Sequence, residues 1–143
     1  DREASEEKML KVLERVKLSE WIEQTANGLK AEIKEGNIGV SVGQAQRIAL
    51  ARLLLRPSSI CIADEPTASL DKDSQHAVWH ALFEHANNSG FILATHSIEQ
   101  LMHMDTIWVL ENGQLVQQDG YQSLMQTKGA FQTMLESQQE SNG

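Results

Sequence analysis

The sequence predicts an α/β fold in which a parallel sheet carries the functional residues. Two mainly apolar runs, residues 60–63 and 91–95, are typical of strands that are buried on both faces of a parallel sheet. A helical pattern that begins at Asp71 lies between them and supplies the right-handed crossover that a parallel pair needs. Further along, Asn112-Gly113 separates two short apolar runs and predicts a β-hairpin around a type I′ turn, followed by closing helices.

The first part of the chain, residues 1–39, is expected to form a small helical subdomain. Ser5 precedes two glutamates, which is typical of a helix N-cap with acidic residues in the first turn. Apolar residues then recur at helical spacing as far as Leu18, and a second short helix is expected from Ser19. Residues 40–143 are expected to form the main part of the fold.

Composition excludes several classes of protein. The net charge of -8 disfavours a nucleic-acid module, because phosphate binding needs clustered Lys and Arg. The single cysteine, Cys61, lies inside an apolar run, so no disulfide framework exists and a reducing compartment is expected. No apolar stretch is long enough for a membrane-spanning helix.

Two adjacent carboxylates, Asp64 and Glu65, end the first predicted strand. In open α/β sheets, ligands bind beyond the carboxyl ends of the strands. The pair is therefore expected at a sheet rim, where a metal ion and a water molecule could be held. His96 follows the second predicted strand and is expected at the same rim, and Ser97 with Gln100 has the spacing of a capping box for the next helix.

A small polar turn, Ser41–Gln44, opens directly into an Ala- and Leu-rich helix that stops at Pro57. The start of such a helix attracts anions, because free backbone N–H groups and the helix dipole point at the ligand. Gly43 would let the backbone approach a phosphate closely, and Ser41 adds a hydroxyl donor. Taken alone, the pattern is as typical of a plain N-cap and a core helix.

Four motifs in this order resemble those of the ATP-binding-cassette (ABC) ATPases. Ser41–Gln44 resembles the signature motif, usually Leu-Ser-Gly-Gly-Gln, with Val42 in place of the first Gly. Residues 60–65 resemble the Walker B motif, residues 68–71 the D-loop and residues 94–97 the H-loop. The resemblance covers about the last three-quarters of the chain and implies a partial P-loop NTPase fold.

The resemblance implies a role for each matching residue. Asp64 would hold Mg²⁺ through a water molecule, and Glu65 would orient and deprotonate the attacking water. His96 would contact the γ-phosphate of ATP and steady Glu65, while Asp71 would report across a subunit interface. Phosphoryl transfer depends mainly on positioning and charge neutralisation, so this small set suffices. The implied nucleotide-binding residues, which face an ATP held by a partner subunit, are Ser41, Val42, Gly43, Gln44 and Asp71.

One part of such a site is absent from the sequence. A P-loop requires Gly-Lys-Ser or Gly-Lys-Thr, and the sequence contains no Gly-Lys pair. The Gln-containing loop that should precede the helical subdomain is missing too. The chain is therefore interpreted as the C-terminal part of a nucleotide-binding domain, expected to be inactive alone and to leave a sheet face and a strand edge uncovered.

A narrower resemblance is to the D-type subunits of heterodimeric bacterial exporters of cysteine and glutathione that are required for cytochrome bd assembly. Residues 41–47, 107–109 and 129–131 carry it. It implies a second ABC subunit, a membrane domain fused upstream, a small thiol substrate, no nucleic-acid partner and a place at the cytoplasmic face of the bacterial inner membrane.

Three function classes stay open at this point. The leading one is the ATPase part of this exporter or of another one for drugs, lipids or peptides. The second is a soluble ABC-type ATPase that acts on nucleic acid, which the acidic balance disfavours. The third is a half-site that binds ATP but hydrolyses it poorly. Val42 keeps this last class open, and the presence of Glu65 and His96 disfavours it.

Overall fold

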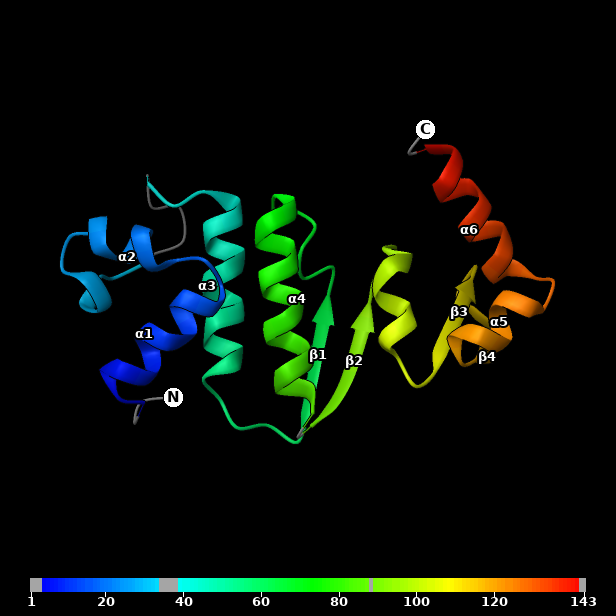
Figure 1. Cartoon of the computed structure of the whole chain (residues 1–143), viewed down its shortest axis with the longest axis horizontal. Coiled ribbons are helices and arrows are strands. Elements are labelled where there is room, and N and C mark those ends of the chain that lie inside the picture. Colours follow the sequence, from blue (N-terminus) through cyan, green and yellow to red (C-terminus); the bar gives the residue numbers. More distant parts are fainter. Residues whose placement is uncertain (1–3, 34–38, 88, 142–143) are drawn as a thin grey trace. The chain divides into compact units, whose positions relative to one another are not determined.

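The computed structural model describes residues 4–33, 39–87 and 89–141 of the 143-residue chain (Figure 1). The chain divides into two compact units, Asp1–Ala94 and Thr95–Gly143, and each has its own core. Within the described ranges, no helix combines the length and the apolar character that crossing a membrane requires.

The helices and strands follow the order that the sequence predicts. The first unit contains α1 (Glu6–Arg15), α2 (Ser19–Gln24), the 3₁₀ helix η1 (Gly28–Lys30), α3 (Val42–Leu54), β1 (Ile60–Asp64), α4 (Lys72–Ala86) and β2 (Gly90–Ala94). The second unit contains the 3₁₀ helix η2 (Ile98–His103), β3 (Ile107–Glu111), β4 (Gln114–Asp119), α5 (Tyr121–Gln126) and α6 (Ala130–Ser141).

The predicted parallel pair is confirmed. β1 and β2 run parallel and in register from Ile60 opposite Gly90 to Asp64 opposite Ala94, with α4 as the connection between them. A parallel pair needs such a crossover, because its strands run in the same direction and no tight turn can join them. In Figure 1, α4 lies between α3 and the two strands. The mixed helix and strand architecture confirms the predicted α/β fold class.

The expectation that the first strand is buried on both faces is wrong for this chain. Cys61 and Ala63 are buried, whereas Ile60 and Ile62 are 61% and 69% exposed. Ile92, opposite Ile62 in the register, is also exposed. Side chains alternate between the two faces of a strand, and in the described part of the chain helices cover only one of them. These exposed residues agree with the expectation that the chain leaves a sheet face uncovered.

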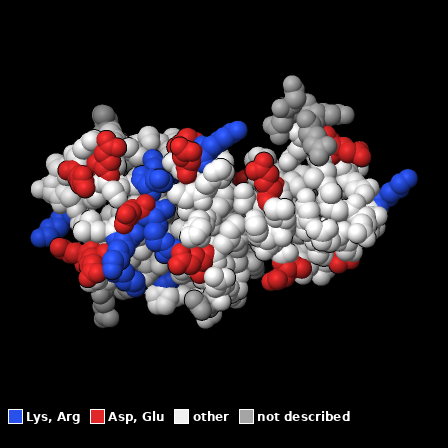
Figure 2. All heavy atoms as spheres, in the orientation of Figure 1, with Lys and Arg blue, Asp and Glu red and all other residues white. Residues whose placement is uncertain are grey.

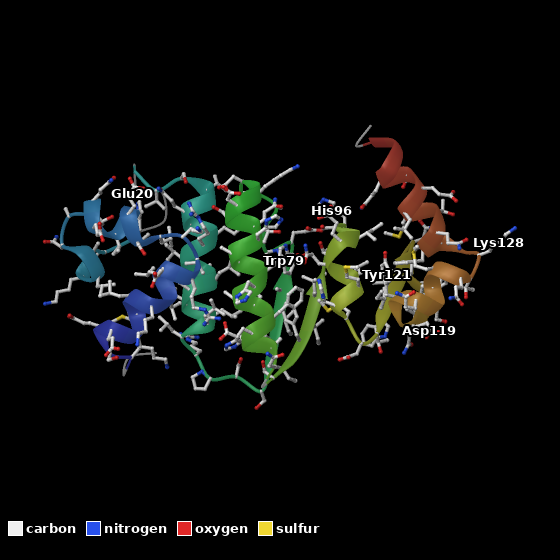
Figure 3. The ribbon with its side chains drawn as sticks, viewed as in Figure 1. Glu20, Trp79, His96, Asp119, Tyr121 and Lys128 are labelled. Carbon is white, nitrogen blue, oxygen red and sulfur yellow. The ribbon has the colours of Figure 1, made fainter. Side chains whose placement is uncertain are left out.

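The core of the first unit joins helices from both sides of residue 39. Val16 and Leu18, which follow α1, are fully buried, as are Val78 and Leu82 of α4. Trp79 is 5% exposed and lies on the side of α4 that faces the strands (Figure 3), so it belongs to the core. The division of the chain at residue 39 stays a prediction.

The second unit is built on the predicted hairpin. Asn112 and Gly113 have φ of 50° and 76°, and a type I′ turn requires such positive angles at both central residues. Ile107 and Val109 of β3 are buried with Phe131 of α6.

The capping box expected at the start of η2 does not form. The Ser97 side chain caps no N–H group of that helix. The backbone N–H of Ser97 instead donates to the Thr95 hydroxyl at 3.0 Å. Such short-range hydrogen bonds of Ser and Thr compete with helix caps, so the spacing of Ser97 and Gln100 alone did not decide the outcome.

Candidate functional site

The turn at Ser41–Gln44 forms a complete capping box at the start of α3. The Ser41 hydroxyl accepts from the Gln44 backbone N–H at 3.1 Å, and the Gln44 side-chain oxygen accepts from the Ser41 backbone N–H at 2.9 Å. Val42, the first helical residue, is 74% exposed. The capping box fixes where the helix starts. Val42 lies at the surface of the helix start.

Gly43 allows a close approach inside the protein. A Cβ atom at this position would lie 3.1 Å from the Ser69 carbonyl oxygen and 3.4 Å from the Leu70 side chain. A side chain at this position would require its neighbours to give way by a few tenths of an ångström. Glycine therefore suits the close packing of α3 against the segment that follows β1, and the phosphate approach stays a prediction.

Asp64 and Glu65 lie where the sequence predicts them, at the carboxyl end of β1. Asp64 is the last residue of the strand and is exposed. Glu65 is half-buried and its φ of 41° is in the left-handed region, which costs a non-glycine residue about 1–3 kcal/mol. Its backbone N–H donates to the Ala94 carbonyl at 2.9 Å, so the end of β2 holds the bend.

Gln46, one turn along α3, joins the helix to this bend. Its side-chain amide N–H donates to the Glu65 carbonyl at 3.0 Å, and its amide oxygen accepts from the Ser69 backbone N–H at 3.3 Å. The sequence analysis did not identify Gln46, because its partners are 19 and 23 residues away along the chain. Its place on α3, just after the signature-like turn, is the only signal that the sequence offers.

The segment between Glu65 and Asp71 is held from α4 as well. Gln75 donates to the carbonyls of Thr67 and Leu70 at 3.3 and 3.0 Å. Thr67 is buried. Two glutamine side chains, one on each of two helices, therefore satisfy backbone groups that no regular element pairs, and they fix the path of the loop.

Asp71 is the N-cap of α4. Its carboxylate accepts from the Ser74 backbone N–H at 2.9 Å and from the Ser74 hydroxyl at 2.7 Å. These two hydrogen bonds, the backbone one first, lower the pKa of Asp71 below its usual value, and the nearby Arg47 guanidinium adds to the effect. Arg47 also donates to the Lys17 carbonyl at 2.7 Å, which links α3 to the end of α1.

His96 belongs to the second unit. It follows the end of β2 by two residues, precedes η2 and is exposed (Figure 3). The Gln138 side chain of α6 donates to its backbone carbonyl. The first unit thus brings together the signature-like turn, the two carboxylates and Asp71, and His96 is positioned by the second unit's own contacts.

The donor set suits a magnesium ion that is shared with a ligand. In the described ranges, no group of three or more His, Cys, Asp or Glu side chains is arranged to hold a metal. Magnesium needs no such cage, because one or two carboxylates, retained waters and substrate phosphates usually complete its shell. Asp64, exposed at the strand end, fits the part of a single carboxylate.

On the face in view in Figure 2, Lys and Arg side chains gather mainly over the first unit, with Asp and Glu side chains beside them. Asp and Glu outnumber Lys and Arg by 20 to 12 in the whole sequence.

Comparison with known proteins finds sequences similar to this chain among ABC transporters. The family model described as ABC transporter matches residues 2–68. The glutathione/L-cysteine transport system ATP-binding/permease protein CydD of Haemophilus influenzae is 41% identical over 140 residues, which is 98% of this chain and 23% of that protein. An ATP-dependent lipid A-core flippase of Shewanella denitrificans is 34% identical over 129 residues, which is 90% of this chain and 22% of that protein.

A solved structure agrees with these relatives. A bacterial Atm1-family ABC exporter with ATP bound matches with a TM-score of 0.83 and 25% sequence identity, over 96% of this chain and 24% of that one. The chain spans less than a quarter of each of these proteins. The findings confirm the resemblance drawn from the four motifs and the partial ABC ATPase fold.

Proposed function

This chain resembles the nucleotide-binding domains of ABC transporters over almost its whole length, and on that premise we propose that it is the C-terminal part of the ATP-hydrolysing domain of a bacterial exporter. The observation that carries the proposal is the joint placement of the signature-like turn and Glu65. Both are attached to α3: the Ser41 side chain caps the start of this helix, and Gln46 of the same helix donates to the Glu65 carbonyl.

In this proposal Glu65 is the general base. Its carboxylate orients the attacking water and accepts its proton as the water oxygen bonds to the γ-phosphorus and the bond from that phosphorus to the ADP oxygen breaks, a role that typically contributes about 10²–10⁴ in rate. Asp64 would hold Mg²⁺ through a water molecule, and the ion would supply charge neutralisation at the phosphates. His96 contacts the γ-phosphate.

The other nucleotide contacts belong to an ATP that the partner subunit holds. The N–H groups at the start of α3 and the Ser41 hydroxyl face its γ-phosphate, an arrangement that a helix start favours. Asp71, close to this helix through Arg47 and Ser74, reports across the interface. The proposed contact residues are those of the signature-like turn and its neighbour in space: Ser41, Val42, Gly43, Gln44 and Asp71.

For the cargo we propose a small thiol of the cysteine or glutathione type. The support is the likeness to a glutathione/L-cysteine transport protein along 98% of the chain. That relative is named as an ATP-binding and permease protein, so a membrane domain upstream of this segment, a second subunit and the cytoplasmic face of the inner membrane follow as parts of the proposal.

A lipid exporter is the second candidate. The lipid A-core flippase relative supports it, with 34% identity over 90% of the chain. The residues of the proposed catalytic site serve both candidates equally, because they act on ATP and not on the cargo. The cargo must therefore be identified by transport measurements.

The test uses the full-length parent protein with its partner subunit in proteoliposomes. Glutathione or cysteine is expected to stimulate ATP hydrolysis, and Glu65→Gln is expected to reduce turnover by about 10²-fold or more while ATP stays bound, because the water loses its base. Glu84→Gln, on the exposed surface of α4, is the matched control and should retain wild-type turnover.

Two results would contradict separate parts of the proposal. Turnover of Glu65→Gln within about threefold of wild type would exclude Glu65 as the base. Stimulation by lipid A-core and not by either thiol would keep the ATPase assignment and replace the cargo.

A further inference from the structure

We propose that Gln46 is a positioning residue for ATP hydrolysis, which couples the signature-like start of α3 to the backbone of Glu65. The inference rests on the proposed function, since it takes Glu65 as the base. It goes beyond that function by naming a residue that touches neither nucleotide nor metal and controls the base from the neighbouring helix.

The backbone of Glu65 needs such a support. Its left-handed φ of 41° is unfavourable for a residue with a side chain, so it persists only where surrounding contacts fix it. The N–H side of the residue is held by the Ala94 carbonyl at 2.9 Å. On the carbonyl side, the Gln46 side-chain amide donates at 3.0 Å from a part-buried position, and the Ala68 N–H donates at 3.3 Å.

The direction of the Glu65 side chain follows from these contacts. The angles φ and ψ set the direction of the Cα–Cβ bond relative to the peptide groups before and after the residue. The orientation of the Glu65 carbonyl fixes its ψ. When the Gln46 N–H is removed, that carbonyl loses the donor that α3 supplies, and the peptide after Glu65 can rotate. A small misplacement of a catalytic group can cost about 10²-fold in rate.

The Gln46 side chain also contacts the segment between Glu65 and Asp71. Its amide oxygen accepts from the Ser69 N–H at 3.3 Å, two residues before Asp71. Gly43, one turn earlier on α3, brings the helix backbone close to the Ser69 carbonyl. A shift of α3 that follows nucleotide binding at its start would therefore move both Glu65 and the segment leading to Asp71.

If Gln46 only filled space, losing its hydrogen bonds would not affect the rate. The test variants therefore keep the size of the side chain and remove its hydrogen bonds. Gln46→Met keeps the shape and removes both bonds, whereas Gln46→Glu keeps an acceptor for Ser69 and removes the donor to Glu65. The matched control is Gln132→Met, because Gln132 also donates to a backbone carbonyl, that of Met125, at 2.7 Å, but lies on α6.

The experiment measures ATP hydrolysis by the full-length protein with its partner subunit. Gln46→Met and Gln46→Glu are each expected to lower kcat by about tenfold or more, with KM for ATP within about threefold of wild type. Gln132→Met should keep both constants. In the Glu65→Gln background, adding Gln46→Met should lower the residual turnover no further, because the group that Gln46 positions is already gone.

Other results would overturn the inference. Wild-type kcat in Gln46→Glu would show that the donor to Glu65 is dispensable, whether or not Gln46→Met folds. An undiminished effect of Gln46→Met in the Glu65→Gln background would mean that Gln46 acts on stability and not through the base. Failure of the proposed function is distinguishable, because it appears in Glu65→Gln alone as unchanged turnover.

Discussion

The Ser41 hydroxyl can serve two partners, because its oxygen accepts a hydrogen bond while its hydrogen donates another. In the structure the oxygen accepts from the Gln44 N–H at 3.1 Å. The proposed function assigns the hydrogen to the γ-phosphate of the partner's ATP. The Ser41 hydroxyl thus has two roles, as a helix cap and as a nucleotide contact, and substitutions can separate them.

Ser41→Gly and Ser41→Ala should weaken ATP-dependent dimerisation of the complete nucleotide-binding domains to the same extent, since both lack the hydroxyl. A hydrogen bond to a charged group is typically worth about 1.5–3 kcal/mol. Only Ser41→Ala should also lower thermal stability, because glycine is a far better N-cap than alanine. Sedimentation with ATP and thermal melts measure the two effects. Loss of ATP affinity in isolated monomers would mean that Ser41 faces its own subunit's site.

At the residue level, the sequence predicted the positions that depend on local pattern. Asp64 and Glu65 end an apolar run, and Ser41 starts a helix, so their places at a strand end and an N-cap follow from short-range rules. The contacts of Gln46 and Gln75 were not predictable, because they depend on how α3 and α4 pack around the loop after β1.

At the level of elements, α4 depends on the cap at Asp71. The carboxylate takes two hydrogen bonds from Ser74, which lower its pKa in the folded chain. A group whose folded pKa lies below its unfolded value of about 3.9 stabilises the fold fully above that value. The stabilisation is lost as the pH falls through the lowered folded pKa.

Asp71→Ala should therefore lower the melting temperature of the chain at pH 7, and the difference from wild type should shrink as the pH falls below the ordinary carboxylate range. Circular-dichroism melts at matched concentration measure both values. Asp73→Ala, an exposed change in the first turn of the same helix, is the control and should lower stability less. A difference that stays constant down to acid pH would contradict the capping role of the charged carboxylate.

The strands show why burial was harder to predict than position. An apolar run such as residues 60–64 indicates a strand in a parallel sheet but cannot say which faces are covered. In the structure Cys61 and Ala63 are buried, and Ile60 and Ile62 remain exposed. Which faces of a strand are covered depends on the elements that pack against it, and the run itself does not show this. The absence of a Gly-Lys pair was the sequence feature that indicated an uncovered face.

At the scale of the whole molecule, the proposed function gives the chain one part of a nucleotide site. The first unit carries the signature-like turn, the carboxylate rim and the D-loop-like segment. The glycine-rich loop and lysine that grip the β- and γ-phosphates do not occur in the sequence. A bare acidic rim repels a triphosphate, and exposed apolar residues on a sheet face favour association with another chain.

The measurement that tests this account most directly is a calorimetric titration of the 143-residue chain with Mg-ATP, combined with sedimentation in the same buffer. The account predicts no measurable binding up to about millimolar ATP, a limit of about -4 kcal/mol in binding free energy, and concentration-dependent self-association. Micromolar ATP binding by a monomer would contradict it, because the phosphate grip would then have to lie within these residues.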